Sequence, residues 1–379
     1  MSEGNQYTKY QYQKLFDLDV EMMRRYGYSE EEAKIIADVL LTSDLFGVES
    51  HGCNRMTLYP FGLDIGRVKR EVGMEDMEVA EDSLCCAVID AKDGMGQLAG
   101  VKGMKLAIEK AKKYGVGMVS VRNSNHYGIA GYYSKLAADA GMMGISMTNA
   151  EALVVPTYGK EPMLGTNPIA VTIPAKPHNF HLDFATSIMT CGKMEVYAKI
   201  DHELKPGMLV DEQGVTSTDP HKFIEIRANK TNPDYKEKTR GGIMPWGGEG
   251  MDFGGHKGFG FGMLVDIMCG IMSHGAVSKG IRVTKKDEKC CHFFAAIDFA
   301  RFGDKEETVR LLSEYMQSMR DAEKAQGQDR IYVHGDKEAD SAKEVMAHGI
   351  GINRATEADI RKYCEKLGIN ADDYLIPAE

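Results

Sequence analysis

The chain has 379 residues, 43% of them hydrophobic and 27% charged, and it carries a formal net charge of −10 at pH 7. This composition is ordinary for a globular protein with a substantial core, and the length suits two domains or one large domain with appendages. Because the charge is negative and no run of lysines or arginines interrupts it, nucleic acid and anionic membrane surfaces are poor candidates for the main partner.

The sequence carries no signal that predicts export or membrane insertion. Its first seven residues are polar and lack the basic-then-apolar order of a signal peptide. The most apolar long segment, Phe259 to Met272, is shorter than the ~20 residues of a membrane span and contains Asp266. The adjacent cysteine pairs Cys85-Cys86 and Cys290-Cys291 lack the spacing of zinc or redox sites. We therefore expect a cytoplasmic protein with buried free thiols and no membrane partner.

Both ends of the chain have helical patterning. Apolar residues recur at helical spacing over residues 14–45, and again over 308–325 and 356–367. We expect the two ends to pack together as one helical domain, formed by residues 1–70 and 310–379.

The middle of the chain alternates strand-like and helix-like segments. Short apolar runs bounded by glycine and proline predict strands at 84–90, 117–121, 143–148, 169–173, 180–184 and 293–299. Helical patterns interleave with them at 97–113, 131–140 and 258–273. Residues 71–309 are thus predicted to form an α/β (mixed α+β) domain, a mixed sheet with covering helices that binds cofactor and substrate. The polar stretch 221–241 is the best candidate for a mobile insertion.

Two glycine-rich segments are candidate phosphate sites. Gly94 to Ala99 fits the Gly-x-Gly-x-x-Ala form of a dinucleotide fingerprint, but the acidic residue expected about 20 positions later is missing. A plain glycine turn before a helix is therefore the favoured interpretation. Gly247 to Gly258 ends where a helix begins, so its backbone amides are suited to a phosphate. No serine or threonine follows Lys257, which excludes a Walker loop and fits a nicotinamide cofactor better.

The most informative segment is Arg122 to Tyr132, which places His126 among amides, hydroxyls and glycines where an apolar strand ends. With an unperturbed pKa near ~6.5, a histidine there is suited to take a proton from an alcohol and return it. The alternative is a turn histidine that binds its own loop.

A second histidine, His51, precedes Arg55 by about one helical turn. A guanidinium matches a carboxylate in two parallel hydrogen bonds while an imidazole serves the adjacent oxygen, which suits a 2-hydroxy or 2-oxo acid. The alternative is that His51 caps a helix and Arg55 is a solvated surface residue. Further along, Asp183 with Thr186 and Ser187 ends a strand in groups that bind ribose and pyrophosphate oxygens, or else caps a helix.

Taken in order, these segments resemble one protein family. The chain is similar to the type-2 malate/L-lactate dehydrogenases, a group that also contains ureidoglycolate and sulfolactate dehydrogenases and a diketogulonate reductase. The matching segments cover most of the chain: Ser50-His51-Gly52 with Arg55 and Tyr59, Asn125-His126-Tyr127-Gly128 with Gly131-Tyr132-Tyr133, Gly165-Thr166-Asn167-Pro168, Asp183-Phe184-Ala185-Thr186-Ser187, Gly192-Lys193, Thr218-Asp219-Pro220 and Gly254-Gly255-His256-Lys257-Gly258.

The resemblance implies a homodimeric NAD- or NADP-dependent 2-hydroxyacid oxidoreductase whose fold is not a Rossmann fold. It implies that His126 is the proton acceptor, with His51 a second acid or base. The substrate contacts would be Arg55, Tyr59 and Glu151. The cofactor contacts would be Asn149, Ala150, Asp183, Phe184, Ala185, Thr186, Ser187, Lys193, Trp246, Gly247, His256, Lys257, His334, Gly335 and Asp336. No resident metal is implied.

Substrate and cofactor form are less constrained than the reaction class. Malate is the first choice of substrate, followed by lactate, ureidoglycolate, sulfolactate or another 2-oxo acid, and NAD is slightly preferred over NADP. His334-Gly335-Asp336 replaces the Pro-Gly-Glu that the family usually has, and 221–241 is longer than the family norm. Two other classes remain open: a metal-dependent hydrolase or lyase using His51, His126 and Asp183, and a non-catalytic binding protein.

Overall fold

A mixed seven-stranded sheet organises the computed structural model, which describes residues 7–231 and 238–378. The strands, in spatial order, are β2 (Glu78–Asp82), β3 (Cys86–Asp90), β4 (Val116–Ser124), β11 (Cys290–Ile297), β5 (Met143–Thr148), β6 (Ile169–Ile173) and β7 (Phe180–Phe184). Only β3 and β4 pair in parallel, and every other neighbouring pair is antiparallel. A Rossmann sheet is built from successive parallel strands, so the predicted non-Rossmann mixed sheet is confirmed.

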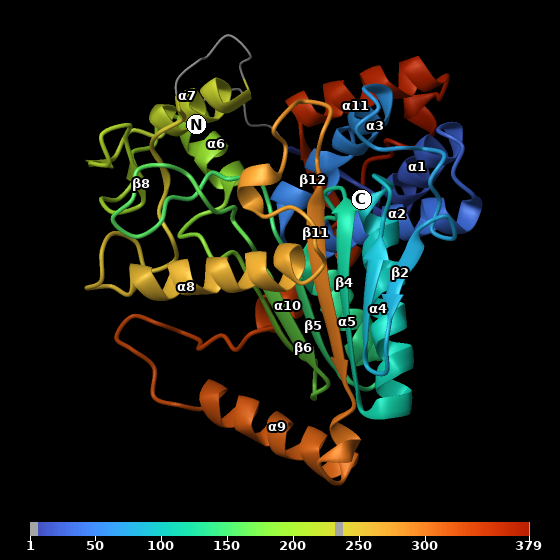
Figure 1. The fold of residues 1–379 in the computed structure, drawn as a ribbon. Helices are drawn as coiled ribbons and strands as arrows, with labels where there is room; N and C mark the ends of the chain where they lie inside the picture. The colour runs from blue at the N-terminus through green and yellow to red at the C-terminus, as the bar shows by residue number, and fades with distance from the viewer. Residues whose placement is uncertain (1–6, 232–237, 379) are drawn as a thin grey trace.

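Helices cover both faces of this sheet (Figure 1). On one face lie α4 (Gly96–Tyr114) and α5 (Ala130–Asp139); on the other lies α8 (Gly255–Asp266), continued by the π-helical turn η3 (Ile267–Ile271). Side chains alternate along β4: Val119 and Val121 join the α4 side, while Met118 packs on the α8 side. Strands buried on both faces explain why the predicted strands read as nearly continuous apolar runs.

The parallel pair belongs to a single β3–α4–β4 unit, and the Gly94 to Ala99 motif forms its turn. A Cβ on Gly96 would overlap the backbone carbonyl oxygens of Asn125 and His126. The glycine therefore lets helix α4 begin against the loop after β4. Its role is close packing, as the glycine-turn interpretation predicted.

The two chain ends pack together, as predicted. They contribute the helices α1 (Tyr12–Arg25), α2 (Glu30–Leu45) and α11 (Arg354–Leu367), and an antiparallel pair of strands, β1 (Tyr7–Tyr10) and β12 (Ile350–Asn353). The Gln11 backbone N–H donates to the Ile376 carbonyl over 3.0 Å, and α10 (Asp336–His348) packs on α2. In contrast, α9 (Lys305–Arg320) lies apart from these helices, and Met316 is its one buried residue (Figure 1).

A smaller unit packs beside the main sheet and carries the stretch that was predicted to be a mobile insertion. Its elements are α6 (Cys191–Lys199), β8 (Leu209–Val210), β9 (Thr216–Ser217), α7 (His221–Thr231) and β10 (Gly242–Ile243). Residues 221–231 of this stretch form helix α7, whose Phe223 and Ile226 are buried. Residues 232–237 lie outside the described residues.

Short helical segments complete the fold: η1 (Glu49–His51), η2 (Cys53–Arg55), α3 (Leu58–Asp64), η4 (Ser278–Gly280), η5 (Phe299–Arg301) and η6 (Ala371–Asp373). No described helix is long and apolar enough to cross a membrane. All eight cysteines are free; Cys290 and Cys291 are buried in β11 as expected, whereas Cys85 and Cys86 are only half-buried.

One core residue makes a test of stability. Asp19 on α1 is fully buried, both of its carboxylate oxygens lack a hydrogen-bond partner among the described residues, and burial raises its pKa to about 7. Between its unfolded pKa near ~3.9 and that value the folded state binds the extra proton, so Asp19 makes stability fall as pH rises. Asp19→Asn should remove this dependence. Relative to wild type, its free energy of unfolding should rise by ~2–4 kcal/mol as the pH goes from 4 to 8.

Urea unfolding of both proteins at pH 5 and pH 8 measures the difference, with Asp139→Asn, an exposed position on α5, as the matched control. If the free energies of unfolding of wild type and Asp19→Asn differ by the same amount at both pH values, Asp19 does not titrate in this range.

Candidate active site

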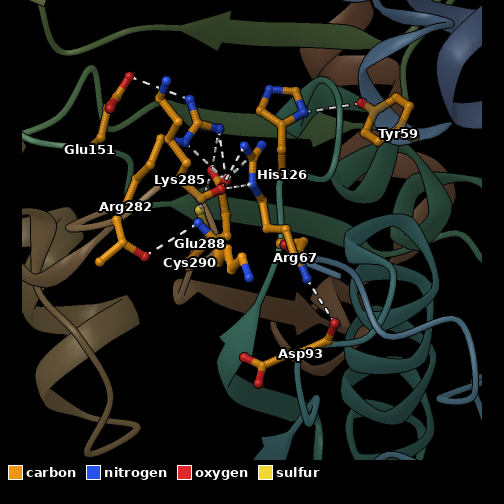
Figure 2. Close-up of polar contacts among 12 residues, drawn as sticks. Tyr59, Arg67, Asp93, His126, Glu151, Arg282, Lys285, Glu288 and Cys290 are labelled. Carbon is orange, nitrogen blue, oxygen red and sulfur yellow. Dashed lines mark hydrogen bonds and ion pairs between the residues drawn. The ribbon is translucent and has the colours of Figure 1, made fainter. Parts of the chain in front are cut away.

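The two histidines singled out by the sequence meet in the structure. His51 lies at the end of η1 and His126 in the loop after β4, yet their rings stack with centroids 5.6 Å apart and planes 20° from parallel. Tyr59 on α3 places its hydroxyl 3.0 Å from His126 Nδ1, as Figure 2 shows. Three segments that are distant in sequence therefore form one polar site.

Backbone packing fixes the loop that carries His126. The Asn125 side-chain amide donates to the carbonyls of Asp93 and Gly94, both over 2.9 Å. Gly128 has φ +87°, and a Cβ there would lie 2.7 Å from Val39. Since only glycine adopts this conformation without strain, the chain turns sharply after His126 and leaves the imidazole at the surface of the site.

The segment that carries His51 and Arg55 rests on a buried carboxylate. Asp44 accepts a hydrogen bond from the Cys53 backbone N–H over 2.7 Å, and a Cβ on Gly52 would overlap its carboxylate. Arg55 Nε donates to the Ser50 carbonyl over 2.9 Å. The side chains of His51 and Arg55 are therefore held by contacts within their own turn.

Both imidazoles are neutral at pH 7. Burial lowers the pKa of His51 to about 4, and the charge of Arg55 adds to this effect. Burial also holds the pKa of His126 well below 6.5, with further contributions from His51, Arg55 and Arg282. The Gly128 backbone N–H donates to His126 Nδ1 over 3.3 Å, so this nitrogen is an acceptor and the Tyr59 hydroxyl donates to it as well. His126 Nε2 faces away from Tyr59 in Figure 2.

Arg55 is a half-buried cation without a counter-ion. Its Nε binds a backbone carbonyl, and within the described ranges it forms no ion pair with a carboxylate. Burial lowers its pKa, and the neighbouring cations Arg227 and Arg282 lower it further. This environment excludes the solvated-surface alternative and favours binding of an anion beside the two histidines.

Glu151, predicted to contact substrate, is surrounded by cations. Its side chain is 10% exposed and lies 3.4 Å from Lys230 Nζ, 3.5 Å from Arg282 Nη1 and 3.6 Å from Arg227 Nε. Burial alone would raise its pKa, but these three cations outweigh burial and lower it. Glu151 is therefore a charged group that holds three basic side chains at the edge of the site.

Sequence reasoning missed Arg282, Glu288 and Arg67. Figure 2 shows Arg282 between Glu151 and Glu288, and its Nη2 lies 2.6 Å from Glu288 Oε1. Arg67 Nη1 lies 3.5 Å from the same carboxylate. Arg282 has φ +49° and precedes a polar loop. No local pattern marks it, because its place depends on the buried partner Glu288.

The comparisons with known proteins agree with this geometry. A family profile described as Malate/L-lactate dehydrogenase matches residues 10–361. The chain is 39% identical to a malate dehydrogenase of Pyrococcus abyssi over 96% of both chains, and 35% identical to an L-sulfolactate dehydrogenase of Methanocaldococcus jannaschii over 94% of this chain and 97% of the relative. A crystal structure of malate dehydrogenase from Entamoeba histolytica superposes with a TM-score of 0.89 at 31% identity, covering 96% of this chain and 99% of that one.

The chain belongs to the malate/L-lactate dehydrogenase family. It is an oxidoreductase that transfers a hydride between a nicotinamide cofactor and a small 2-hydroxy or 2-oxo acid. In the described residues no group of three or more histidine, cysteine, aspartate or glutamate side chains could hold a metal ion.

Among this dehydrogenase's expected cofactor residues, four lie in a glycine-lined cradle. Gly258 and Gly255 allow the start of α8 to approach the backbone of Trp246 and Gly248, because a Cβ on either would overlap a carbonyl oxygen there. The resulting N-terminus of α8 presents backbone N–H groups, which suits a pyrophosphate. The four predicted residues in this segment are Trp246 and Gly247 before the turn, half-buried His256, and exposed Lys257.

The segment after β7 is adjacent to this cradle, since the Phe184 ring lies 5.5 Å from Trp246. Asp183 accepts from the Gly131 N–H over 2.7 Å, and burial raises its pKa to about 6. The two hydroxyls bind backbone: Thr186 donates to Asn167 over 3.0 Å and Ser187 to Met189 over 2.7 Å. Ala185, between them and Phe184, is half-buried. The next helix, α6, is capped by Thr190, whose hydroxyl accepts from the Lys193 N–H over 3.4 Å, so the helix-cap interpretation of this segment is wrong.

Asn149 and Ala150 form a locked turn at the end of β5. Asn149 donates to the Ala276 carbonyl and accepts from the Cys291 N–H, both over 2.8 Å, while the Ala150 N–H donates to Asn167 over 3.0 Å. Lys193 is separate from this turn: it is exposed on α6, with its ammonium 5.7 Å from the Tyr197 ring centre.

The loop 334–336 lies beside the start of β7, where the His181 N–H donates to the His334 carbonyl over 3.2 Å. Gly335 has φ +105° and caps α10. Asp336 is fully buried and engaged by Arg320 at 2.8 Å and His178 at 2.8 Å. Side chains of the protein already bind the Asp336 carboxylate, so any contact of this loop with a cofactor would use other atoms.

Proposed function

We propose that this chain is a malate dehydrogenase that interconverts malate and oxaloacetate. The observation that carries the proposal is an unpaired Arg55 guanidinium beside two neutral imidazoles. Relatives named malate dehydrogenase, at up to 39% identity over nearly the whole chain, support this choice of acid. Lactate, ureidoglycolate, sulfolactate and other 2-oxo acids of the same class are the alternatives.

In the proposed mechanism the C1 carboxylate of the substrate pairs with Arg55, and the 2-hydroxyl proton passes to the imidazole of His126. Tyr59 holds Nδ1 of His126 through the 3.0 Å hydrogen bond and so orients the ring. His51, stacked on His126, is the second acid or base candidate. In the reverse direction His126 returns the proton to the carbonyl oxygen as the hydroxyl forms.

The start of α8 fits a nicotinamide cofactor, because a helix N-terminus presents backbone N–H groups to a phosphate, and its glycines let this turn pack against the backbone of Trp246 and Gly248. Gly247, the first turn of α8 and Asp183 are the residues we propose to hold it, with NAD slightly preferred over NADP. When bound, the cofactor supplies the hydride acceptor for C2.

We also propose a homodimer in the cytoplasm. Leu264, Ile267 and Ile271 on α8 and η3 are exposed at helical spacing, an arrangement that supports burial against a second copy. Eight free cysteines support a reducing compartment.

A panel of 2-oxo acids tests the activity directly. Purified protein is mixed with NADH or NADPH and with oxaloacetate, pyruvate or another 2-oxo acid, and the loss of nicotinamide absorbance is followed. We expect oxaloacetate to be the fastest substrate and NADH the better reductant. Absence of turnover with every acid and both cofactors would contradict the proposal.

Arg55→Lys tests the carboxylate contact. A lysine keeps the charge but offers one point contact in place of a two-pronged one, so the KM for oxaloacetate should rise about 10-fold or more with a smaller change in kcat. Steady-state kinetics against Lys34→Arg, an exposed position on α2, measures the effect. An unchanged KM would place the substrate carboxylate elsewhere.

A further inference from the structure

Helix α7 directs two cations toward the proposed substrate site. Arg227 and Lys230 lie one helical turn apart, with side chains 31% and 15% exposed, and both face Glu151. Arg282, which lies outside α7, pairs with the same Glu151 carboxylate. Helix α6 links these cations to Arg55: the Cβ position of Gly192 on α6 lies 3.6 Å from Arg55 Nη2, and Arg227 pairs with Glu195 on the same helix. The basic side chains of α7 therefore lie on the side of the site where Arg55 is unpaired.

The carboxylates in this cluster do not saturate its cations. Arg227, Lys230 and Arg282 lie 3.4 to 3.6 Å from Glu151, whereas a charge-assisted hydrogen bond is usually about 2.7–2.9 Å long. Lys230 has three N–H donors and, among the described residues, Glu151 as its one ion-pair partner. Arg227 also binds Glu195 through Nη1, and Arg282 binds Glu288. Donors thus remain for a further anion.

We propose that Arg227 and Lys230 bind a second acidic group on the substrate, a carboxylate or a sulfonate at the end distant from C1. This inference rests on the proposed function, in which Arg55 takes the C1 carboxylate. Helix α7 then determines specificity: it makes the enzyme prefer 2-oxo diacids over 2-oxo monoacids, whose distal end is uncharged.

The charge of Glu151 argues against the opposite specificity. A cationic or hydrogen-bond-donating distal group would need a free carboxylate, but Glu151 already faces three cations, which lower its pKa. Burial lowers the pKa of Lys230, and the attraction between Lys230 and Glu151 opposes this lowering. A second anion beside Lys230 would stabilise the charged form of Lys230 in the same way. A diacid can use the N–H donors that Glu151 and Glu195 leave free, whereas the uncharged end of a monoacid cannot.

The test compares diacid and monoacid substrates in variants of α7. Lys230→Met removes one cation, and Arg227→Met combined with Glu195→Gln removes the other without leaving Glu195 unpaired. The matched control is Lys222→Met, because Lys222 lies on the same helix and pairs with exposed Glu225. We expect kcat/KM for oxaloacetate to fall about 10- to 100-fold, mainly through KM, while that for pyruvate stays within about two-fold. Sulfopyruvate in parallel separates a carboxylate preference from a sulfonate preference.

Equal losses with oxaloacetate and pyruvate, or no loss with either, would overturn the inference and assign α7 a structural role. A wild-type enzyme that reduces pyruvate as well as both diacids would overturn it too, while leaving the dehydrogenase function intact. If no 2-oxo acid is reduced, the proposed function fails. The inference is then tested separately by the change in melting temperature that a diacid or a monoacid causes. Succinate should then stabilise wild type more than propionate does, and the α7 variants should lose that difference; equal shifts in wild type would overturn it.

Discussion

Replacing His126 by alanine is expected to lower the turnover of a 2-hydroxy acid by about 10²- to 10⁴-fold, the range typical of a lost general base. The substrate and cofactor should still bind, because Arg55 and the glycine-lined start of α8 are separate from the imidazole. The loss should therefore appear in kcat, with a dissociation constant for NADH close to that of wild type. Steady-state kinetics and nicotinamide fluorescence measure the two quantities.

The pH dependence of the wild-type enzyme gives an independent check on the same residue. The neutral form of His126 is the base, and burial together with His51 and Arg55 holds its pKa well below 6.5. The neutral base therefore persists as pH falls below 6.5, so the acid limb of the malate oxidation profile should lie lower than for an ordinary histidine. An exposed histidine paired with Asp201, His221, supplies the control variant His221→Ala. Near-normal turnover in His126→Ala would remove His126 from the mechanism.

The sequence predicted the central sheet well because its strands carry a strong local signal. The ranges of β5, β6 and β7 are those expected, since each is a short apolar run bounded by polar, glycine or proline residues. The predicted meeting of His51, His126 and Arg55 also agrees with the structure. In that case the signal was the resemblance to a family, because nothing local relates a helix end near residue 50 to a loop near residue 126.

What the sequence did not predict depends on tertiary contacts. Strands β8, β9 and β10 have two residues each, which is too short for any periodicity to appear. Helix α7 reads as a polar stretch because only its buried face, with Phe223 and Ile226, is apolar. Arg282 enters the site through its ion pair with Glu288, and the local sequence around it resembles any charged loop.

Asp336 lies in a loop that departs from the usual Pro-Gly-Glu of the family, and its partners in the structure are side chains of the protein itself. The resemblance predicted a cofactor contact for the loop 334–336, but the carboxylate is buried and bound by Arg320, by His178 and by the Val333 N–H at 3.0 Å. Burial opposes its ionisation, yet the bonds from Arg320 and Val333 and the neighbouring charges outweigh burial and lower its pKa to about 2. Asp336 therefore stabilises the fold above its unfolded pKa near ~3.9, and this contribution is lost as pH falls through about 2.

Asp336→Ala is accordingly expected to destabilise the protein by about 3–5 kcal/mol at pH 7, since it leaves the Arg320 guanidinium, only 14% exposed, without its buried counter-ion. Urea unfolding measures this, with Asp372→Ala as the control, because Asp372 is an exposed carboxylate that pairs with Arg361. The KM for the cofactor separates the two roles: if the Asp336 carboxylate binds the cofactor, Asp336→Ala raises that KM while stability stays near that of Asp372→Ala. A large loss of stability is what the ion pairs require, because the buried carboxylate is already bound by Arg320, Arg330 and His178. It has little acceptor capacity left for a ribose hydroxyl, and no solvent replaces the charge that the substitution removes.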